Sequence, residues 1–140
     1  MAAGVTDGSG DLPASGKRAG FPASARLLKH ADFERVYKQG RRHFSPHMTV
    51  FFLPRPQGKG LRVGFTAGRM LGGAVQRNRI KRRMREAVRL HRGQTTVPAD
   101  VVINPKKSVL IAEFTVLSQE VERAFAVIQQ KLIEKGTARN

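Results

Sequence analysis

A basic stretch over residues 69–92 constrains this chain more than any other feature, because nine of its 24 residues are Lys or Arg and Glu86 is its one acid. Apolar side chains recur through it at helical spacing, which predicts a helix from about residue 73 to about residue 90. Cations in the first turns of a helix oppose the helix dipole, and cations three or four residues apart repel each other. The segment therefore loses stability as an isolated helix, which favours a bound anion over a merely solvated face.

The predicted helix has two different faces when its residues are projected at about 100° per residue. The face expected to pack against the rest of the domain carries Ile80, Met84, Ala87 and Val88. The opposite face carries Asn78, Lys81, Arg82, Arg85 and Arg89. A row of arginines suits bidentate contact with phosphates, and a helix start preceded by Gly72 and Gly73 lets an anion approach the backbone. We therefore interpret this helix as a nucleic-acid-binding element.

The overall charge points to the same class of partner. With 26 Lys plus Arg against 10 Asp plus Glu, the formal net charge is +16. An excess of this size in a small domain is typical of proteins that bind nucleic acid or an anionic membrane surface. A membrane-surface helix needs Trp, Phe or Leu to enter lipid, and the apolar face of this helix has none. The helix-turn-helix spacing of a DNA-binding protein is also missing from the sequence.

The 140 residues are enough for one compact domain. We predict a disordered tail over residues 1–22, a single RNA-binding domain over residues 23–135, and a disordered end over residues 136–140. The sequence contains no run of 18 apolar residues and no secretory signal, so we expect a cytoplasmic protein with no membrane partner.

Helical periodicity also predicts a helix over residues 31–39, and another whose apolar positions run from Leu117 to Leu132. For the second helix we expect Ser118 as N-cap, Glu120 and Glu122 in the first turn, and an end at Gly136. Alternating or β-branched runs predict strands over residues 47–53, 61–67 and 101–103, with an edge strand near residues 42–45. Residues 106–114 leave loop, strand and helical turn open.

The residue types needed for catalysis by the polypeptide are scarce. The chain has no cysteine, which excludes a disulfide framework and a thiolate metal site. Pro46 lies between His43 and His47 and disfavours the helix that would align them on one metal ion. Residues 68–73 lack the Gly-Lys-Ser/Thr ending of a phosphate-binding Walker loop. We therefore assign no catalytic residue and no metal site to the protein.

Residues 72–88, GGAVQRNRIKRRMREAV, closely resemble the signature of the protein subunit of bacterial ribonuclease P. The pattern of that family is A-x-x-R-N-R-[hydrophobic]-K-R-x-[hydrophobic]-R. Other blocks agree in order and spacing, namely Arg26-Leu27 followed by Asp32-Phe33 and Gly40, then LRVGF at 61–65, then DVVI at 100–103. Together these blocks cover about residues 26 to 128.

The resemblance implies a fold. It is an α+β two-layer sandwich in the order α-β-β-β-α-β-α, like the second domain of ribosomal protein S5. A central mixed sheet is packed by helices, and a left-handed crossover places the Arg-Asn-Arg helix on the sheet. That hand is rare for parallel connections, and nothing in the residue pattern itself predicts it.

The resemblance also implies a function. The protein would bind the catalytic RNA of ribonuclease P and the 5′ leader of precursor tRNA, and the assembled ribonucleoprotein would cut that leader to give the mature tRNA 5′ end. The RNA would carry the catalysis with Mg²⁺, while the polypeptide binds no cofactor itself, and no protein partner is implied. The predicted contacts to the catalytic RNA are Arg69, Arg77, Asn78, Arg79, Lys81, Arg82, Arg85 and Arg89.

Aromatic residues suggest a second RNA contact. Phe33 and Tyr37 lie one turn apart on the first predicted helix, and Phe51 would point to the strand face opposite Val50 and Phe52. From composition alone these side chains could be core, or they could stack on the bases of single-stranded RNA. The resemblance favours stacking, because equivalent positions line the cleft that holds the precursor leader.

The sequence departs from the family pattern at two places. Arg69-Met70 stands where many relatives have two lysines. Asn104-Pro105 stands where they carry Ala-Arg, which shifts the expected cationic contact to Lys106 and Lys107. We include Lys106 in the predicted leader cleft. The alternative function, which the charge supports equally, is a structural rRNA-binding protein of ribosomal type.

Overall fold

The computed structural model describes residues 29–139. The elements follow one another as α1 (His30–Gln39), β1 (Arg41–Phe44), β2 (Met48–Pro54), β3 (Leu61–Phe65), η4 (Arg69–Leu71), α2 (Ala74–His91), η5 (Arg92–Gln94), β4 (Ala99–Pro105), η6 (Lys107–Leu110) and α3 (Phe114–Arg139). This confirms the predicted α-β-β-β-α-β-α order and the α+β class. The predicted tail over residues 1–22 lies outside the described residues.

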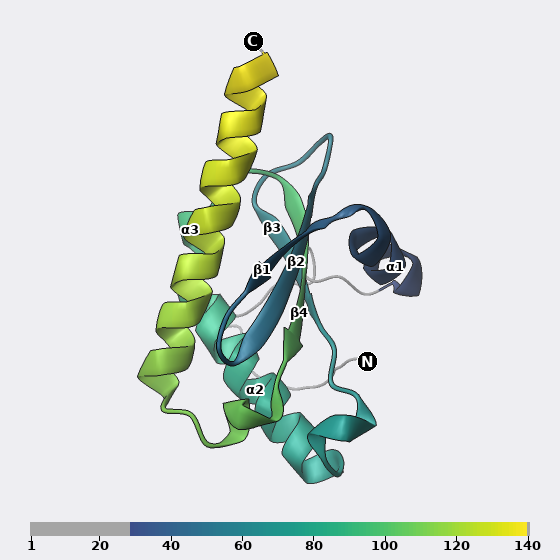
Figure 1. Ribbon diagram of the computed structural model, residues 1–140, viewed down its shortest axis with the longest axis vertical. Helices are drawn as coiled ribbons and strands as arrows, with labels where there is room; N and C mark the ends of the chain where they lie inside the picture. Colours follow the sequence, from purple (N-terminus) through teal and green to yellow (C-terminus); the bar gives the residue numbers. More distant parts are fainter. Residues whose placement is uncertain (1–28, 140) are drawn as a thin grey trace, which may run out of the picture.

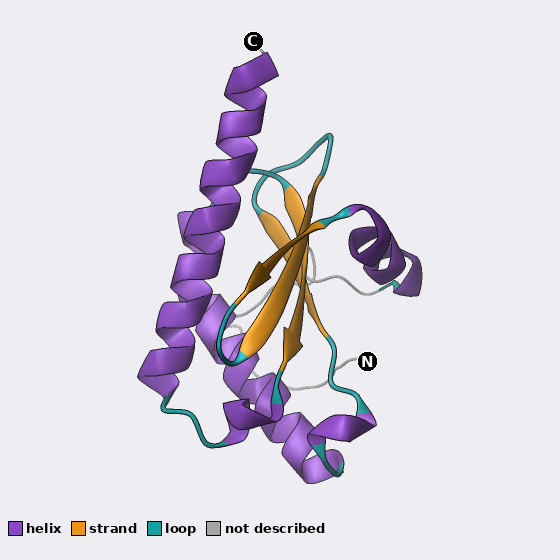
Figure 2. Cartoon of the chain, in the orientation of Figure 1, coloured by secondary structure: helices purple, strands orange, loops and turns teal. Residues whose placement is uncertain are grey.

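The four strands form one mixed sheet in the order β1-β2-β4-β3 (Figures 1 and 2). β2 pairs antiparallel with both β1 and β4, while β3 and β4 run parallel. β4 is the last strand in the sequence, yet it lies in the interior of the sheet between β2 and β3. The predicted strand over residues 101–103 is the centre of β4, and the edge strand predicted near residues 42–45 is β1.

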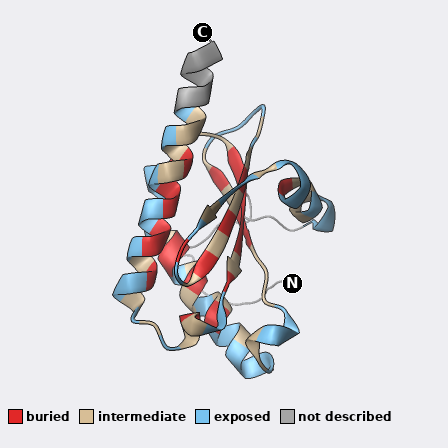
Figure 3. Cartoon of the chain, viewed as in Figure 1, coloured by how far each residue is buried: buried red, intermediate tan, exposed pale blue. Residues whose placement is uncertain are grey.

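The main core lies between the sheet and the two longer helices, α2 and α3 (Figure 3). Alternate residues of β2 point into it, which is why Met48, Val50 and Phe52 are buried. From α2 the core takes Ile80, Met84, Ala87 and Val88, as the helical projection predicts. One face of α2 is thereby fixed against the domain, and its cationic face is directed away from it.

The shorter helix α1 covers part of the other face of the sheet, on the side away from α3 (Figure 1). Val36 packs there on Val102, with Phe33, Phe51 and Leu53 around them. Gly40 ends α1 where the chain turns into β1. A Cβ at that position would lie 2.5 Å from the Val36 carbonyl oxygen and 2.7 Å from that of Phe52, so only glycine fits there. α1 thus forms a partial third layer beside the predicted sandwich.

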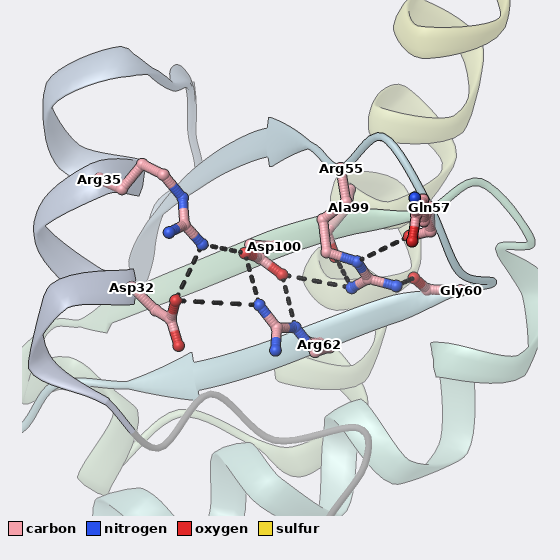
Figure 4. Close-up of polar contacts among 8 residues, drawn as sticks. All are labelled: Asp32, Arg35, Arg55, Gln57, Gly60, Arg62, Ala99 and Asp100. Atoms are coloured by element: carbon pink, nitrogen blue, oxygen red, sulfur yellow. Dashed lines mark hydrogen bonds and ion pairs between the residues drawn. The ribbon is translucent and has the colours of Figure 1, made fainter.

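A buried carboxylate ties α1 to the sheet (Figure 4). Asp100 of β4 is 1% exposed and accepts hydrogen bonds from Arg35 of α1, Arg62 of β3 and Arg55, at 2.8–3.2 Å. Asp32 lies beside it and accepts a bond of 2.9 Å from Arg35. Burial alone would raise the pKa of Asp100, but the hydrogen bonds from Arg62, Arg35 and Arg55 outweigh it and hold this pKa below its ordinary value.

The prediction for the start of the last helix is wrong. α3 begins at Phe114, so Ser118 is not its N-cap and Glu120 and Glu122 are not in its first turn. The Ser118 hydroxyl instead lies 2.6 Å from His91 Nε2. Glu120 is buried and accepts a hydrogen bond of 3.0 Å from the backbone N–H of His47. These tertiary partners, which lie far away in the sequence, account for the two polar residues that resembled a helix start.

The far end of α3 also differs from the prediction. The helix passes through Gly136 and ends at Arg139, where the sequence predicted a stop and a disordered segment over residues 136–140. A glycine inside a helix costs about 1 kcal/mol relative to alanine, which a helix of 26 residues tolerates. Residue 140 lies outside the described part of the chain.

Candidate nucleic-acid interface

The outer face of α2 presents a row of cations with few partners. Arg82 and Arg79 are exposed and Arg77 is half-buried, and none of their three guanidinium groups bonds to another residue within the described part of the chain. Asn78 is exposed beside them. Glu86, the acid of this helix, pairs with Arg89, which leaves these guanidinium groups available to phosphate oxygens. The structure therefore brings Arg77, Asn78, Arg79 and Arg82 together on the outer face of α2, and their contact with RNA stays a prediction.

Other cations of α2 have roles inside the protein. Arg89 forms an ion pair with Glu86 three residues earlier, donating through both Nε and Nη2. This contact raises the pKa of Arg89, and the Glu86 carboxylate partly neutralises the charge of its guanidinium group. Arg83 donates to the carbonyl oxygen of Ala112 beyond η6, so it belongs to the packing of the domain. Lys81 and Arg85 are half-buried on the predicted RNA face.

The first turn of α2 is built without the usual stabilising groups. Gly73 is the N-cap and offers no side-chain hydrogen bond, and the first turn contains no acidic residue. Gly72 precedes it with φ of 118°, a conformation that residues with a side chain rarely adopt. Arg69 lies just before this turn, in η4, and is exposed. The helix start is thus open to an anion and flanked by cations.

The part of the sheet that α1 leaves uncovered forms a second candidate surface, which we call the open sheet face. The strand register places Phe44 opposite Thr49, and Thr49 opposite Asn104, so one row of side chains crosses β1, β2 and β4. Thr66, just beyond β3, extends this row and donates to Asn104. Its members used below are Tyr37, Arg42, Phe44, Phe51, Asn104 and Thr66.

Aromatic rings and a cation lie together on the open sheet face. Tyr37, in the last turn of α1, meets Phe51 edge to face with ring centroids 4.9 Å apart. The Arg42 guanidinium lies 5.7 Å from the ring centroid of Phe44 and 5.9 Å from that of Phe51. Phe44 is 69% exposed and Tyr37 38% exposed. Exposed rings beside a cation are the arrangement on which single-stranded RNA stacks irrespective of base.

The structure does not bring all residues of the predicted leader cleft together. Tyr37 and Phe51 are in contact, whereas Phe33 is half-buried and packs against Val36 and Val102. Lys106 is exposed two residues beyond Asn104, after the end of β4. Among the described residues, neither Lys106 nor Lys107 bonds to the open sheet face.

Sequence reasoning missed four members of this surface, namely Arg42, Phe44, Thr66 and Asn104. The signal for two of them was present, because Arg42 and Phe44 alternate along a predicted edge strand and so point to one face. The signal for Asn104 and Thr66 was absent, because their contact joins residues 38 positions apart in the sequence. Thr66 lies three positions before Arg69, so the same loop leads from the open sheet face to the start of α2.

Two other kinds of site are absent from the described residues. Within residues 29–139, no three His, Asp or Glu side chains come together as a metal ion would need. The helices of the same range include none with the length and apolar composition to cross a membrane.

Comparison with known proteins decides the family. The model of the family described as ribonuclease P matches residues 21–129. This chain belongs to the ribonuclease P protein family. The resemblance seen in residues 72–88 is confirmed, and the alternative of a ribosomal-type protein is not supported.

Relatives in this family match most of the chain. A ribonuclease P protein component from Desulfovibrio desulfuricans is 42% identical over 88 residues, which are 62% of this chain and 68% of that protein. One from Symbiobacterium thermophilum is 42% identical over 100 residues, 71% of this chain and 87% of that protein. The solved structure of the Staphylococcus aureus RNase P protein superposes with a TM-score of 0.65 at 25% identity, covering 75% of this chain and 95% of that one. The ribonuclease P protein fold is therefore shared.

Proposed function

We propose that this chain is the protein component of a ribonuclease P ribonucleoprotein and acts on precursor tRNA through two surfaces. The outer face of α2 binds the catalytic RNA, and the open sheet face binds the 5′ leader of the precursor. The observation that carries the proposal is the row of Arg77, Arg79 and Arg82, whose guanidinium groups have no partner within residues 29–139, on a helix with no acid in its first turn. Membership of the ribonuclease P family supports it independently.

The α2 surface suits a folded RNA because its charges are fixed in place. The opposite side of the helix is buried through Ile80, Met84 and Val88, so the cationic row has one orientation relative to the domain. Guanidinium groups held in this way bind phosphates without the loss of helix freedom that an isolated basic segment would incur. Binding also removes the repulsion among the cations, so the contact stabilises both partners.

The open sheet face suits a single strand such as the leader. Phe44 and the Tyr37–Phe51 pair offer ring surfaces for bases, while Arg42 offers charge for the backbone. Stacking of one base on an aromatic ring contributes about 1–3 kcal/mol. Mature tRNA lacks the leader, so this surface favours the precursor over the product.

For the chemical step we propose that the RNA subunit supplies the catalysis together with Mg²⁺. The donor groups of residues 29–139 do not gather into a set that fits this ion, whereas RNA phosphates are oxygen ligands of the kind that Mg²⁺ prefers. The residues of this chain neutralise charge and position the substrate. Because the substrates are tRNA precursors, we expect the protein to act in the cytoplasm.

Reconstitution tests the proposal. Catalytic RNA alone, at a low Mg²⁺ concentration, should cleave precursor tRNA slowly, and addition of this protein should restore cleavage. A higher concentration of the Arg82→Ala variant than of the wild type should be needed to reach the same cleavage rate. Lys59→Ala removes an equal charge from the exposed β2–β3 loop and should act as the wild type does. Absence of any stimulation by the wild-type protein would contradict the proposed function and favour a structural rRNA-binding role.

A further inference from the structure

Basic side chains of β1 point to the side of the sheet that α3 covers. Arg41 and His43 alternate along β1, and the residues opposite them on β2 are Phe52 and Val50, which are buried in the main core. Opposite residues of an antiparallel pair lie on the same side of a sheet. Arg41 and His43 therefore point toward α3 and away from the open sheet face. The Arg41 guanidinium, 6.0 Å from the Phe52 ring centroid, agrees with this direction.

Two cations of α3 approach the same histidine. Burial lowers the pKa of His43 below its ordinary value, and the nearby charges of Lys131 and Arg123 lower it further. The groups that face His43 are thus Arg41 on its own strand, the apolar Val50 on β2, and Arg123 and Lys131 on α3. We call Arg41, His43, Arg123 and Lys131 the β1–α3 cluster.

The β1–α3 cluster contains no acid. Within residues 29–133, Arg41, Arg123 and Lys131 form no ion pair and no side-chain hydrogen bond. Glu120 lies one turn before Arg123, but its carboxylate accepts from the backbone N–H of His47 and lies 3.6 Å from the ring of that residue. Cations that are held together without a counter-charge repel each other, so a bound anion would stabilise this part of the fold.

The imidazole of His43 gives a second, independent indication of a ligand. Its Nε2 is buried and forms no hydrogen bond within the described residues. Buried polar atoms almost always have a partner, so this nitrogen is suited to one from outside the chain. A ring nitrogen of histidine donates when it carries a proton, and the adjacent cations favour an acceptor with negative charge. Arg41 and Arg123 are exposed, so the cluster is open to a large anionic molecule.

We propose that the β1–α3 cluster binds a phosphate group of RNA, with its three cations neutralising the charge and His43 donating to a phosphate oxygen. The proposal rests on the proposed function, which makes RNA the partner, and adds a third surface to it. That surface is separate from the other two. The open sheet face lies on the other side of the sheet, and β3, which leads into α2, is at the opposite edge from β1.

The first test uses sulfate as the probe, because it stays doubly charged while a histidine titrates. The pKa of His43 is followed by NMR in the full chain, with the same ionic strength supplied by sulfate or by chloride. A bound anion offsets the charges of Arg123 and Lys131, so sulfate should raise the pKa of His43 relative to chloride, to a saturating value. His30, which is exposed and pairs with Glu34, is the internal control and should titrate alike in both salts.

The second test measures RNA binding. Arg123→Ala should weaken binding about 3- to 10-fold and reduce the salt dependence by about one phosphate, with thermal melting unchanged. Lys59→Ala removes an equal charge from the exposed β2–β3 loop and should bind as the wild type does. A weaker complex between protein and catalytic RNA assigns the phosphate to that RNA. A holoenzyme that binds precursor and mature tRNA equally less well assigns it to the body of the tRNA.

The outcomes distinguish this inference from the function on which it rests. If sulfate and chloride give the same pKa for His43, the cluster binds no anion and the proposal is overturned. If sulfate raises that pKa but Arg123→Ala binds both RNAs as the wild type does, the cluster takes an adventitious ion only, and the RNA contact is overturned. If the wild type does not stimulate cleavage, yet sulfate acts on His43 and Arg123→Ala weakens RNA binding, the proposed function fails and the phosphate site stands.

Discussion

At the residue scale, Asp100 shows how one carboxylate organises an otherwise cationic protein. Three arginines from α1, β3 and the β2–β3 loop donate to it, and each would repel the others without it. Arg55 also donates to the carbonyl oxygens of Ala99 and Gly60, so the same cluster holds the loop in place (Figure 4). The position of α1, and with it one side of the open sheet face, depends on this group.

Replacing Asp100 should therefore destabilise the fold strongly. We expect Asp100→Asn to lower the free energy of unfolding by about 3 kcal/mol, because it removes the buried counter-charge of three half-buried arginines. The more exposed Asp32→Asn is the matched control and should cost about 1 kcal/mol. Urea denaturation of the two variants measures both values. Equal, small losses would contradict a central role for Asp100.

The same carboxylate makes stability depend on pH. Because the pKa of Asp100 is lower in the folded chain, its contribution is complete above the unfolded pKa of about 3.9 and is lost as the pH falls through the folded value. The free energy of unfolding should thus decrease below about pH 4. Asp100→Asn should flatten this decrease. A variant with the full wild-type acid dependence would assign the effect to other carboxylates.

Phe44 has no functional role in the predictions made from the sequence, but the structure places its exposed ring on the open sheet face. It is the most exposed ring of the open sheet face. We expect Phe44→Ala to weaken holoenzyme binding of precursor tRNA about 5- to 100-fold, the loss of one stacked base, with mature tRNA unaffected. Comparing dissociation constants for the two substrates measures this effect. An equal loss for both would remove Phe44 from the leader site.

At the element scale, α2 combines two neighbouring arginines with opposite roles. Arg82 is exposed and has no partner in the described chain, while Arg83 donates to Ala112. We expect Arg82→Ala to weaken binding of the catalytic RNA, with thermal stability unchanged or raised by a few degrees because repulsion falls.

The matched variant Arg83→Ala should behave in the opposite way. It removes the link between α2 and the segment after η6, so we expect a loss of about 1–2 kcal/mol in stability and little direct change in RNA affinity. Thermal melting and filter binding on both proteins make the comparison. If Arg82→Ala unfolds the domain, its role is structural and the proposed RNA face is incorrect.

Other elements show where sequence patterns succeed and where they fail. The two faces of α2 follow from helical spacing alone, so the buried set was predicted without error. The start of α3 was misplaced by five residues, because Ser118 and Glu120 are polar for a tertiary reason, their contacts with His91 and His47. A local pattern cannot distinguish a helix cap from a buried hydrogen bond.

At the scale of the whole molecule, the formal charge of +16 predicts a binding reaction driven by counterion release. If about six phosphates are neutralised, the affinity for RNA should fall by about two to three decades between about 50 and 200 mM salt. Titrations at several salt concentrations give the slope. An affinity that does not change with salt would contradict the model of a phosphate-binding surface.

The sequence by itself determined the class of partner and the helix that meets it. Charge and helical periodicity are local properties, so they can be taken directly from residues 69–92. The open sheet face was decided only by the tertiary structure. Its members come from α1, three strands and a loop, and the Asn104 amide is oriented by hydroxyls 67 and 38 positions away. Hydrogen bonds over such separations depend on strand order and register, which no local pattern specifies.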